Sequence, residues 1–133
     1  MNTAYVDTSV LTAIAFEKPG ASDYADRLAG FDGLVSSNLL EAELRAAFAR
    51  EALAFREDTI ARIEWVLPDR PLGAELASVL EAGYLRGADL WQVAAALHAS
   101  PRPGGLAFAT LDARQAAVAR ALGFALAWEA DPL

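Results

Sequence analysis

Cysteine is absent from this chain of 133 residues, and histidine occurs once, at His98. The lack of cysteine excludes disulfides, iron–sulfur clusters, cysteine-bound zinc and thiol nucleophiles. One histidine also excludes a metal site built from several histidines, and it leaves a single candidate base for a Ser-His-Asp triad. The reactive groups that remain are mostly carboxylates, so aspartate and glutamate are the first candidates for catalysis or metal binding.

Positive charge is scarce as well, since 11 lysines and arginines stand against 18 aspartates and glutamates, a net charge of −7. This balance argues against nucleic-acid binding through a broad basic surface. It suits a metal ion, a cationic ligand or a basic protein partner. The chain begins without the basic segment of a signal peptide, and no uncharged apolar run approaches the ~18 residues of a membrane span. We therefore expect a soluble, cytoplasmic protein without membrane contact.

The length leaves room for one domain of ordinary size, because domains cluster near ~100 to 150 residues. Hydrophobic residues make up 55% of the chain, which is enough for a core without disulfides. No repeat and no linker-like tract interrupts the sequence. We expect a single domain over residues 1–133.

Short apolar runs alternate along the chain with longer segments of helical pattern. Strands are predicted at about residues 5–6, 33–35, 65–67, 106–109 and 124–127. Helices are predicted at about residues 8–16, 21–28, 38–52, 57–64, 72–81, 89–99 and 112–121. This alternation requires crossover connections and predicts an α/β fold, a three-layer α/β/α sandwich with a mostly parallel central sheet. Ligands of such folds bind at the carboxyl ends of the strands.

Two aspartates lie where that rule places a ligand. Asp7 ends the first predicted strand, and Asp112 lies just past the strand at 106–109. Helix capping offers another explanation, because aspartate is a preferred N-cap residue. Asp89 and Asp112 both have glutamine three residues later, the capping-box arrangement. Asp7 could likewise mark only the change from strand to helix, so each of the three has a structural as well as a functional explanation.

Helical geometry separates the two glutamates of the predicted helix at 38–52, because each residue advances by about 100°. Glu43 lies near the centre of the apolar arc of this helix. Glu41 points away from the arc and follows Asn38 by three residues, where a capping-box glutamate belongs. A carboxylate on a buried face is costly unless it is paired or binds a metal. Glu43 is therefore a candidate ligand, and a salt bridge to Arg50 is its alternative role.

The four candidate carboxylates come from separate segments that an α/β fold could gather at one edge of its sheet: Asp7, Glu43, Asp89 and Asp112. Two ionised carboxylates about 4 Å apart repel by ~4 kcal/mol at an effective dielectric constant of about 20. Such a cluster needs protons or a cation, and oxygen ligands suit Mg²⁺ or Mn²⁺. A divalent ion held by carboxylates is a common means of activating water against a phosphodiester.

Four stretches in this order carry a resemblance to a known family. They are YVDTSVL at 5–11, SS at 36–37 ahead of EL at 43–44, ADLWQVAAAL at 88–97, and ATLD at 109–112 followed by ARALGF at 119–124. Together they resemble the PIN domain, and specifically the toxin component of VapBC type II toxin–antitoxin modules. The similarity runs nearly from end to end, and its order is far more specific than any single motif.

The resemblance implies a Mg²⁺- or Mn²⁺-dependent endoribonuclease with an α/β/α sandwich. Asp7, Glu43, Asp89 and Asp112 would form its acidic quartet. Asp7 and Asp89 would be direct metal ligands, whereas Glu43 and Asp112 would act directly or through water. The hydroxyl groups of Thr8, Ser9 and Thr110 would support these carboxylates, and their alternative is a role as ordinary cap and turn hydroxyls. The family often has histidine at the position of Gln92 and threonine at that of Ala95.

The implied reaction is in-line attack of metal-activated water on RNA phosphorus, which releases the 3′-oxygen and leaves a 5′-phosphate. The implied partners are an RNA substrate, a small basic antitoxin whose arginine-bearing tail enters the acidic site, and a second copy of the chain. An antitoxin groove is expected among the helices between residues 21 and 64. Four arginines could contact phosphates or simply be solvated: Arg45, Arg86, Arg102 and Arg114.

Two other functions compete with this interpretation. A haloacid-dehalogenase-like phosphatase also places its nucleophilic aspartate after a strand, but it needs a second aspartate two residues later, where this chain has Ser9. A non-catalytic PIN-fold binding module would use the acids only as caps and docking groups. The presence of all four acids disfavours this second alternative.

Overall fold

Five parallel strands form the centre of the structure, a computed structural model that describes residues 2–128. The strands are β1 (Thr3–Val6), β2 (Gly33–Ser37), β3 (Ile63–Val66), β4 (Ala107–Ala109) and β5 (Ala125–Leu126). Their order in the sheet is β3-β2-β1-β4-β5, and every pair is parallel. The predicted mostly parallel sheet is therefore confirmed.

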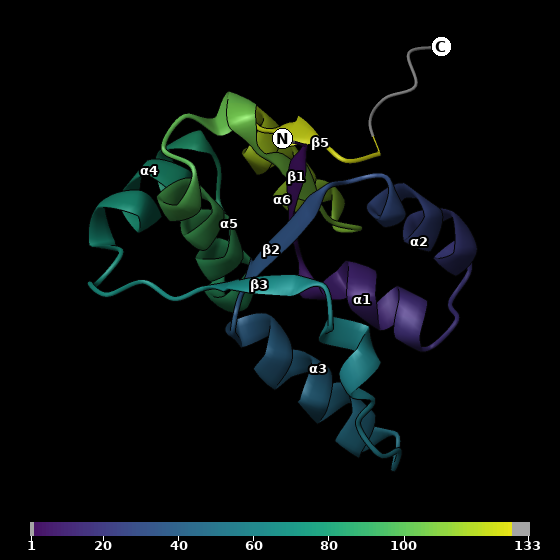
Figure 1. Ribbon diagram of the computed structural model, residues 1–133. Helices are drawn as coiled ribbons and strands as arrows, with labels where there is room; N and C mark the ends of the chain where they lie inside the picture. Colours follow the sequence, from purple (N-terminus) through teal and green to yellow (C-terminus); the bar gives the residue numbers. More distant parts are fainter. Residues whose placement is uncertain (1, 129–133) are drawn as a thin grey trace.

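Helices cover both faces of this sheet (Figure 1). One layer contains α1 (Thr8–Ala15), α2 (Ala21–Ala29) and α3 (Leu39–Arg50), and the other contains α4 (Gly73–Ala82), α5 (Gly87–Ala99) and α6 (Ala113–Ala121). Strand β1 divides the two cores by its alternation, since Ala4 and Val6 pack on the first layer and Tyr5 packs on the second. The predicted three-layer α/β/α sandwich is confirmed.

The helix predicted at 57–64 is wrong. Only a short 3₁₀ helix, η1 (Glu57–Ile60), forms there, and β3 begins at Ile63. Ile63 is buried and pairs with Leu34 of β2, so the chain gains ladder hydrogen bonds and core contacts that a longer helix would forfeit. The strand predicted at 65–67 thus exists and begins two residues earlier. A second 3₁₀ turn, η2 (Pro103–Gly105), precedes β4.

The chain changes direction across the sheet at β1, which lies between β2 on one side and β4 on the other. The backbone N–H of Asp7 donates to the carbonyl of Ala109 over 2.9 Å and extends the pairing of β1 with β4 by one residue. The residues that follow these two strands therefore lie together at a topological switch point, where open α/β sheets bind ligands. Within residues 2–128, no helix is long and apolar enough to cross a lipid bilayer.

Candidate active site

Asp7 lies at the switch point and is 5% exposed. It is the N-cap of α1, and its Oδ2 atom accepts a hydrogen bond from the backbone N–H of Ser9 over 3.0 Å. Its Oδ1 atom accepts from the side-chain amide of Gln115 over 3.3 Å. Each carboxylate oxygen has two acceptor positions, so these bonds fix the carboxylate and leave lone pairs for a ligand.

The hydroxyl groups of Ser9 and Thr110 join the loop after β4 to Asp7. Thr110 Oγ1 lies 3.5 Å from both Ser9 Oγ and Asp7 Oδ2, and it donates to Gln115 Oε1 over 2.6 Å. In return, the backbone N–H of Leu111 donates to Ser9 Oγ over 3.1 Å. These hydroxyls are therefore part of the network that holds Asp7 in place.

Glu43 reaches the same place from α3. Its Oε1 atom accepts from the hydroxyl of Thr8 over 2.6 Å, and the glutamate lines a cavity of about 450 Å³ together with Asp7 and Asp89. Arg50 also lines this cavity, but its guanidinium lies 3.6 Å from Glu51. The alternative salt bridge between Glu43 and Arg50 does not form.

Glu41, on the same helix, has a different environment. Its carboxylate forms an ion pair with Arg45 over 2.7 Å, one turn further along α3. The predicted capping box is wrong, because the side chain of Asn38 makes no cap hydrogen bond. The Glu41 carboxylate, which the sequence pattern assigned to the start of the helix, binds Arg45 instead.

Asp89 is not a helix cap, contrary to the capping alternative. Helix α5 begins two residues earlier at Gly87, with Arg86 as its N-cap residue, so Asp89 lies in the first turn. Its carboxylate is half-buried and, within residues 2–128, accepts no hydrogen bond. Burial raises the pKa of Asp89, and the neighbouring carboxylates of three acids, Asp7, Asp112 and Glu43, raise it further. The other three predicted acids therefore lie close enough to Asp89 to affect its pKa.

Asp112 does cap α6, as the pattern predicts, since its Oδ1 atom accepts from the backbone N–H of Gln115 over 2.8 Å. The second half of the capping box is missing, because the Gln115 side chain turns to Asp7 and to the carbonyl of Asp89. Asp112 lines a cavity of about 250 Å³ with Asp89 and Arg86. Asp89 thus stands between two adjoining cavities, one with Asp7 and Glu43 and one with Asp112.

Two buried glutamines and a tyrosine support the site without a sequence signal for this role. Gln92 donates to the hydroxyl of Thr8 over 3.3 Å and accepts from the hydroxyl of Tyr5 and from Ser37 Oγ. Burial raises the pKa of Tyr5 to about 12, so its phenol remains a donor at neutral pH. In the sequence, Gln92 and Gln115 are visible only as cap partners three residues after an aspartate.

The donor set fits a hard divalent cation. Three carboxylates face one cavity, and no described lysine or arginine forms an ion pair with them. Burial and the charges of the neighbouring acids raise the pKa of Asp89 against the opposite effect of Arg86, and a cation with oxygen ligands would relieve the repulsion between the carboxylates. As the side chains of residues 2–128 stand, no three acidic or histidine groups are already placed around one point to hold an ion. Binding would thus require side-chain movement.

The raised pKa of Asp89 predicts that Asp89→Asn stabilises the metal-free protein. A carboxyl group with a raised pKa disfavours the folded state when ionised, so stability is lost above its ordinary pKa and regained as pH falls. In EDTA at pH 7, we expect the melting temperature of Asp89→Asn to lie about 2 to 5 °C above that of the unmodified chain. The gain should shrink as pH falls toward about 4, near the ordinary pKa of aspartate, because Asp89 of the unmodified chain is then protonated in the folded state.

Asp32→Asn is the matched control, because Asp32 is exposed and accepts only from the backbone N–H of Asn2, at the opposite edge of the sheet. Thermal unfolding of both variants by circular dichroism measures the difference. A melting temperature of Asp89→Asn equal to or below that of the unmodified chain would contradict the electrostatic interpretation.

Comparison with known proteins gives one family. A family model described as PIN domain matches residues 4–132, a range that contains all four acids. No curated protein and no solved structure matches the chain. The family match therefore covers both helical layers and the whole sheet except Thr3, the first residue of β1.

Proposed function

The chain belongs to the PIN domain family, and from this premise we propose that it is a Mg²⁺- or Mn²⁺-dependent endoribonuclease, the toxin of a VapBC type II toxin–antitoxin module. PIN domains are generally metal-dependent nucleases. The observation that carries the proposal is the meeting of four acids from four segments, in which three of them raise the pKa of the fourth, Asp89. Perturbed carboxylates in a cleft at a switch point are typical of a functional site.

In this proposal, Asp7 and Asp89 bind the cation directly, and Glu43 and Asp112 bind it directly or through water. The bound ion would supply a Lewis acid that neutralises phosphate charge and activates water for in-line attack. The chain itself aims the carboxylates. Ser9 and Gln115 fix Asp7, while Thr8 fixes Glu43 at the same cavity.

An anionic substrate can approach the site despite the net charge of −7. Lys18 and Arg50 line the cavity that contains Asp7 and Glu43. A cation at the carboxylates and these two side chains together offer local positive charge to a phosphate. The RNA substrate therefore depends on the metal for attraction as well as for chemistry.

A protein partner is part of the proposal. A groove of about 300 Å³ lies among α1, α2 and β3, and Leu11, Ile14 and Leu28 give it apolar walls. We propose that the antitoxin and a second copy of the chain use this helical layer, and that an arginine of the antitoxin enters the acidic cavity. The proposal also treats residues 1–133 as one PIN domain that acts in the cytoplasm. Residues 1 and 129–133 lie outside the described part of this range.

Metal removal tests the proposal. The purified protein is incubated with total cellular RNA, and fragment ends are mapped by sequencing. We expect discrete fragments with 5′-phosphates in Mg²⁺ or Mn²⁺, no cleavage in EDTA, and recovery when the ion is restored. A generic phosphomonoester should remain intact, which separates this activity from a dehalogenase-like phosphatase. Cleavage that persists undiminished in EDTA, or hydrolysis of the monoester alone, would overturn the proposal.

A further inference from the structure

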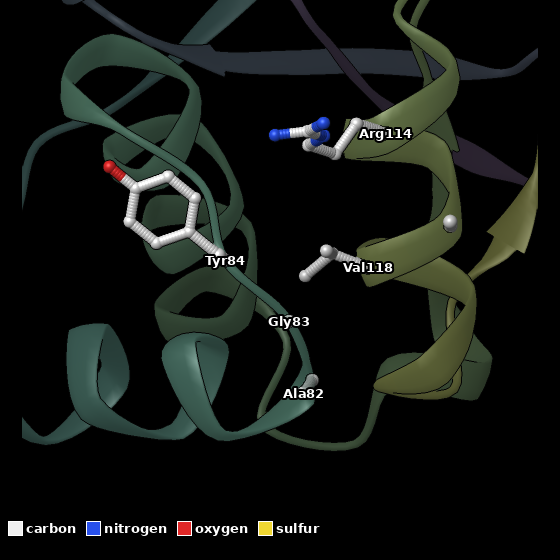
Figure 2. A pocket seen from close by; sticks show the side chains of 6 residues that line it. Ala82, Gly83, Tyr84, Arg114 and Val118 are labelled. Carbon is white, nitrogen blue, oxygen red and sulfur yellow. The ribbon is translucent and has the colours of Figure 1, made fainter.

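A further cavity, of about 300 Å³, lies between the segment that joins α4 to α5 and helix α6. Figure 2 shows it from close by. Its lining consists of Ala82, Gly83, Tyr84, Arg114, Ala117 and Val118. These residues contain no carboxylate, in contrast to the acidic cavities beside them.

The two large side chains of this cavity come from the segments on either side of it, and the ring of Tyr84 points away from Arg114 (Figure 2). Tyr84 is 64% exposed, although an aromatic ring of this size gains free energy from burial. Arg114 extends from α6 toward the segment that carries Tyr84 (Figure 2). Within residues 2–128, Arg114 has neither an ion-pair nor a hydrogen-bond partner. Both groups are therefore available to a ligand.

Gly83 forms part of the floor of the cavity. A Cβ atom at Gly83 would lie 2.8 Å from Cγ2 of Val118, too close for a real contact. The backbone at residue 83 therefore packs directly against α6. The result is a hollow with an apolar floor, the guanidinium of Arg114 on the α6 side, and the exposed ring of Tyr84 at its rim (Figure 2).

Arg114 also connects this hollow with the acids. The same side chain lines the cavity of about 250 Å³ that contains Asp89, Asp112 and Arg86. Only the side chain of Arg114 would thus separate a ligand in the hollow from the cavity that contains the carboxylates. Arg86 lines that acidic cavity as well.

We infer that Tyr84 and Arg114 form a subsite for one unpaired nucleobase of single-stranded RNA, next to the phosphate that lies at the acids. The inference rests on the proposed function. Unpaired bases stack on aromatic rings, and the exposed ring of Tyr84 offers such a face beside Arg114. Arg86 and Arg114 contact the phosphates on either side of the stacked base. Paired bases of a duplex are already stacked on one another and do not reach the ring.

The structure separates these two arginines from the other two candidates for phosphate contact. Arg45 is engaged by Glu41 and Glu57 and lies 4.1 Å above the centre of the Phe55 ring. Arg102 precedes β4, so it lies at the amino edge of the parallel sheet, opposite the acids. Only Arg86 and Arg114 of this set border the acidic residues.

Binding of labelled RNA tests the subsite apart from cleavage. Fluorescence anisotropy in Ca²⁺ compares a single-stranded oligonucleotide with a duplex of the same length. We expect Tyr84→Ala to weaken single-strand binding by about 5-fold to 150-fold, the range for one base–aromatic stack. Duplex binding should be unchanged. Tyr84→Phe should bind as the unmodified chain does, because the ring and not the hydroxyl makes the stack. Arg114→Ala should weaken both complexes.

Two controls keep the comparison specific. Leu53→Ala removes an apolar side chain that is 53% exposed beyond the end of α3, and Arg102→Ala removes a cation at the far edge of the sheet. Neither change should alter binding. Equal single-strand affinity of Tyr84→Ala and the unmodified chain would overturn the subsite, as would equal losses in Tyr84→Phe and Tyr84→Ala.

The proposed function and the subsite can fail separately. Cleavage in Mg²⁺ together with Tyr84-independent binding would overturn the subsite alone. Tyr84-dependent binding without any cleavage would overturn the nuclease and support the subsite. Absence of RNA binding by the unmodified chain would overturn the subsite whatever the catalytic result.

Discussion

Asp7→Asn is expected to abolish RNA cleavage, with a fall in kcat/KM of more than about 100-fold. Loss of a residue that merely supports a metal ligand already costs about 10-fold to 100-fold in metal affinity or activity, and Asp7 is proposed as a ligand itself. The substitution removes one negative charge and one acceptor oxygen from the most buried acid of the group, which is 5% exposed. The isosteric amide leaves the volume of the site unchanged.

The fold should survive this change. An asparagine oxygen can still accept from the backbone N–H of Ser9, so the N-cap of α1 is retained. The amide would face the Gln115 side chain, donor against donor, and cost about 1 kcal/mol for one lost hydrogen bond. Relief of repulsion on Asp89 opposes this loss. We expect the melting temperature in EDTA to move by no more than about 5 °C.

Metal-dependent stabilisation provides a second measurement for the same variant. A ligand that binds only the folded state stabilises it by about 2.7 kcal/mol at 100 times its dissociation constant. Mn²⁺ should therefore raise the melting temperature of the unmodified chain and of Asp32→Asn, but hardly that of Asp7→Asn. Undiminished cleavage by Asp7→Asn would refute the proposed metal site, because Asp7 is one of its two direct ligands in the proposal.

The alternation of strands and helices was predictable because it follows from the local spacing of apolar residues. The exception, residues 57–64, depends on a distant partner, since β3 exists only through its pairing with β2. Its residues Ile63 and Trp65 pair with Leu34 and Ser36, about thirty positions earlier in the chain. A window that sees only neighbouring residues cannot weigh those pairings, and tertiary contacts override local preference in such segments.

The four candidate acids could be selected from the sequence, but the residues that hydrogen-bond to the site could not. Asp7 and Asp112 follow strands, which is a positional signal. The start of α5 was misplaced because it begins at Gly87, whose φ of 44° suits glycine and is no capping signal. Gln115 meets Asp7 across 108 positions, and Gln92 meets Thr8 across 84. Such contacts follow from the packing of α5 and α6 on the sheet, so no local pattern announces them.

Glu43→Gln and Glu41→Gln are expected to have opposite outcomes, although they make the same chemical change two residues apart on α3. Glu43→Gln should lower kcat/KM by at least about 100-fold, in line with the loss of a group that holds a metal ligand or water in place. Its amide oxygen can still accept from the hydroxyl of Thr8, so the local structure should remain. The loss would then report the missing charge in the cavity shared with Asp7 and Asp89.

Glu41→Gln should keep activity within about twofold. Glu41 pairs with Arg45 on the outer side of α3, and such a pair is worth about 0.3 to 0.5 kcal/mol. Loss of the pair leaves Arg45 with Glu57, 3.1 Å away, and should lower the melting temperature by no more than about 2 °C. Initial rates on RNA and thermal unfolding in EDTA measure the two effects separately.

Equal losses of activity in both variants would show that net charge, rather than position, governs RNA binding by this acidic chain. The repulsion of RNA by the whole surface changes by the same one unit in Glu41→Gln and Glu43→Gln. Any difference in rate between them must therefore come from where each carboxylate lies. A large loss for Glu43 alone, accompanied by weaker stabilisation of that variant by Mn²⁺, would assign its charge to the cation and not to the fold.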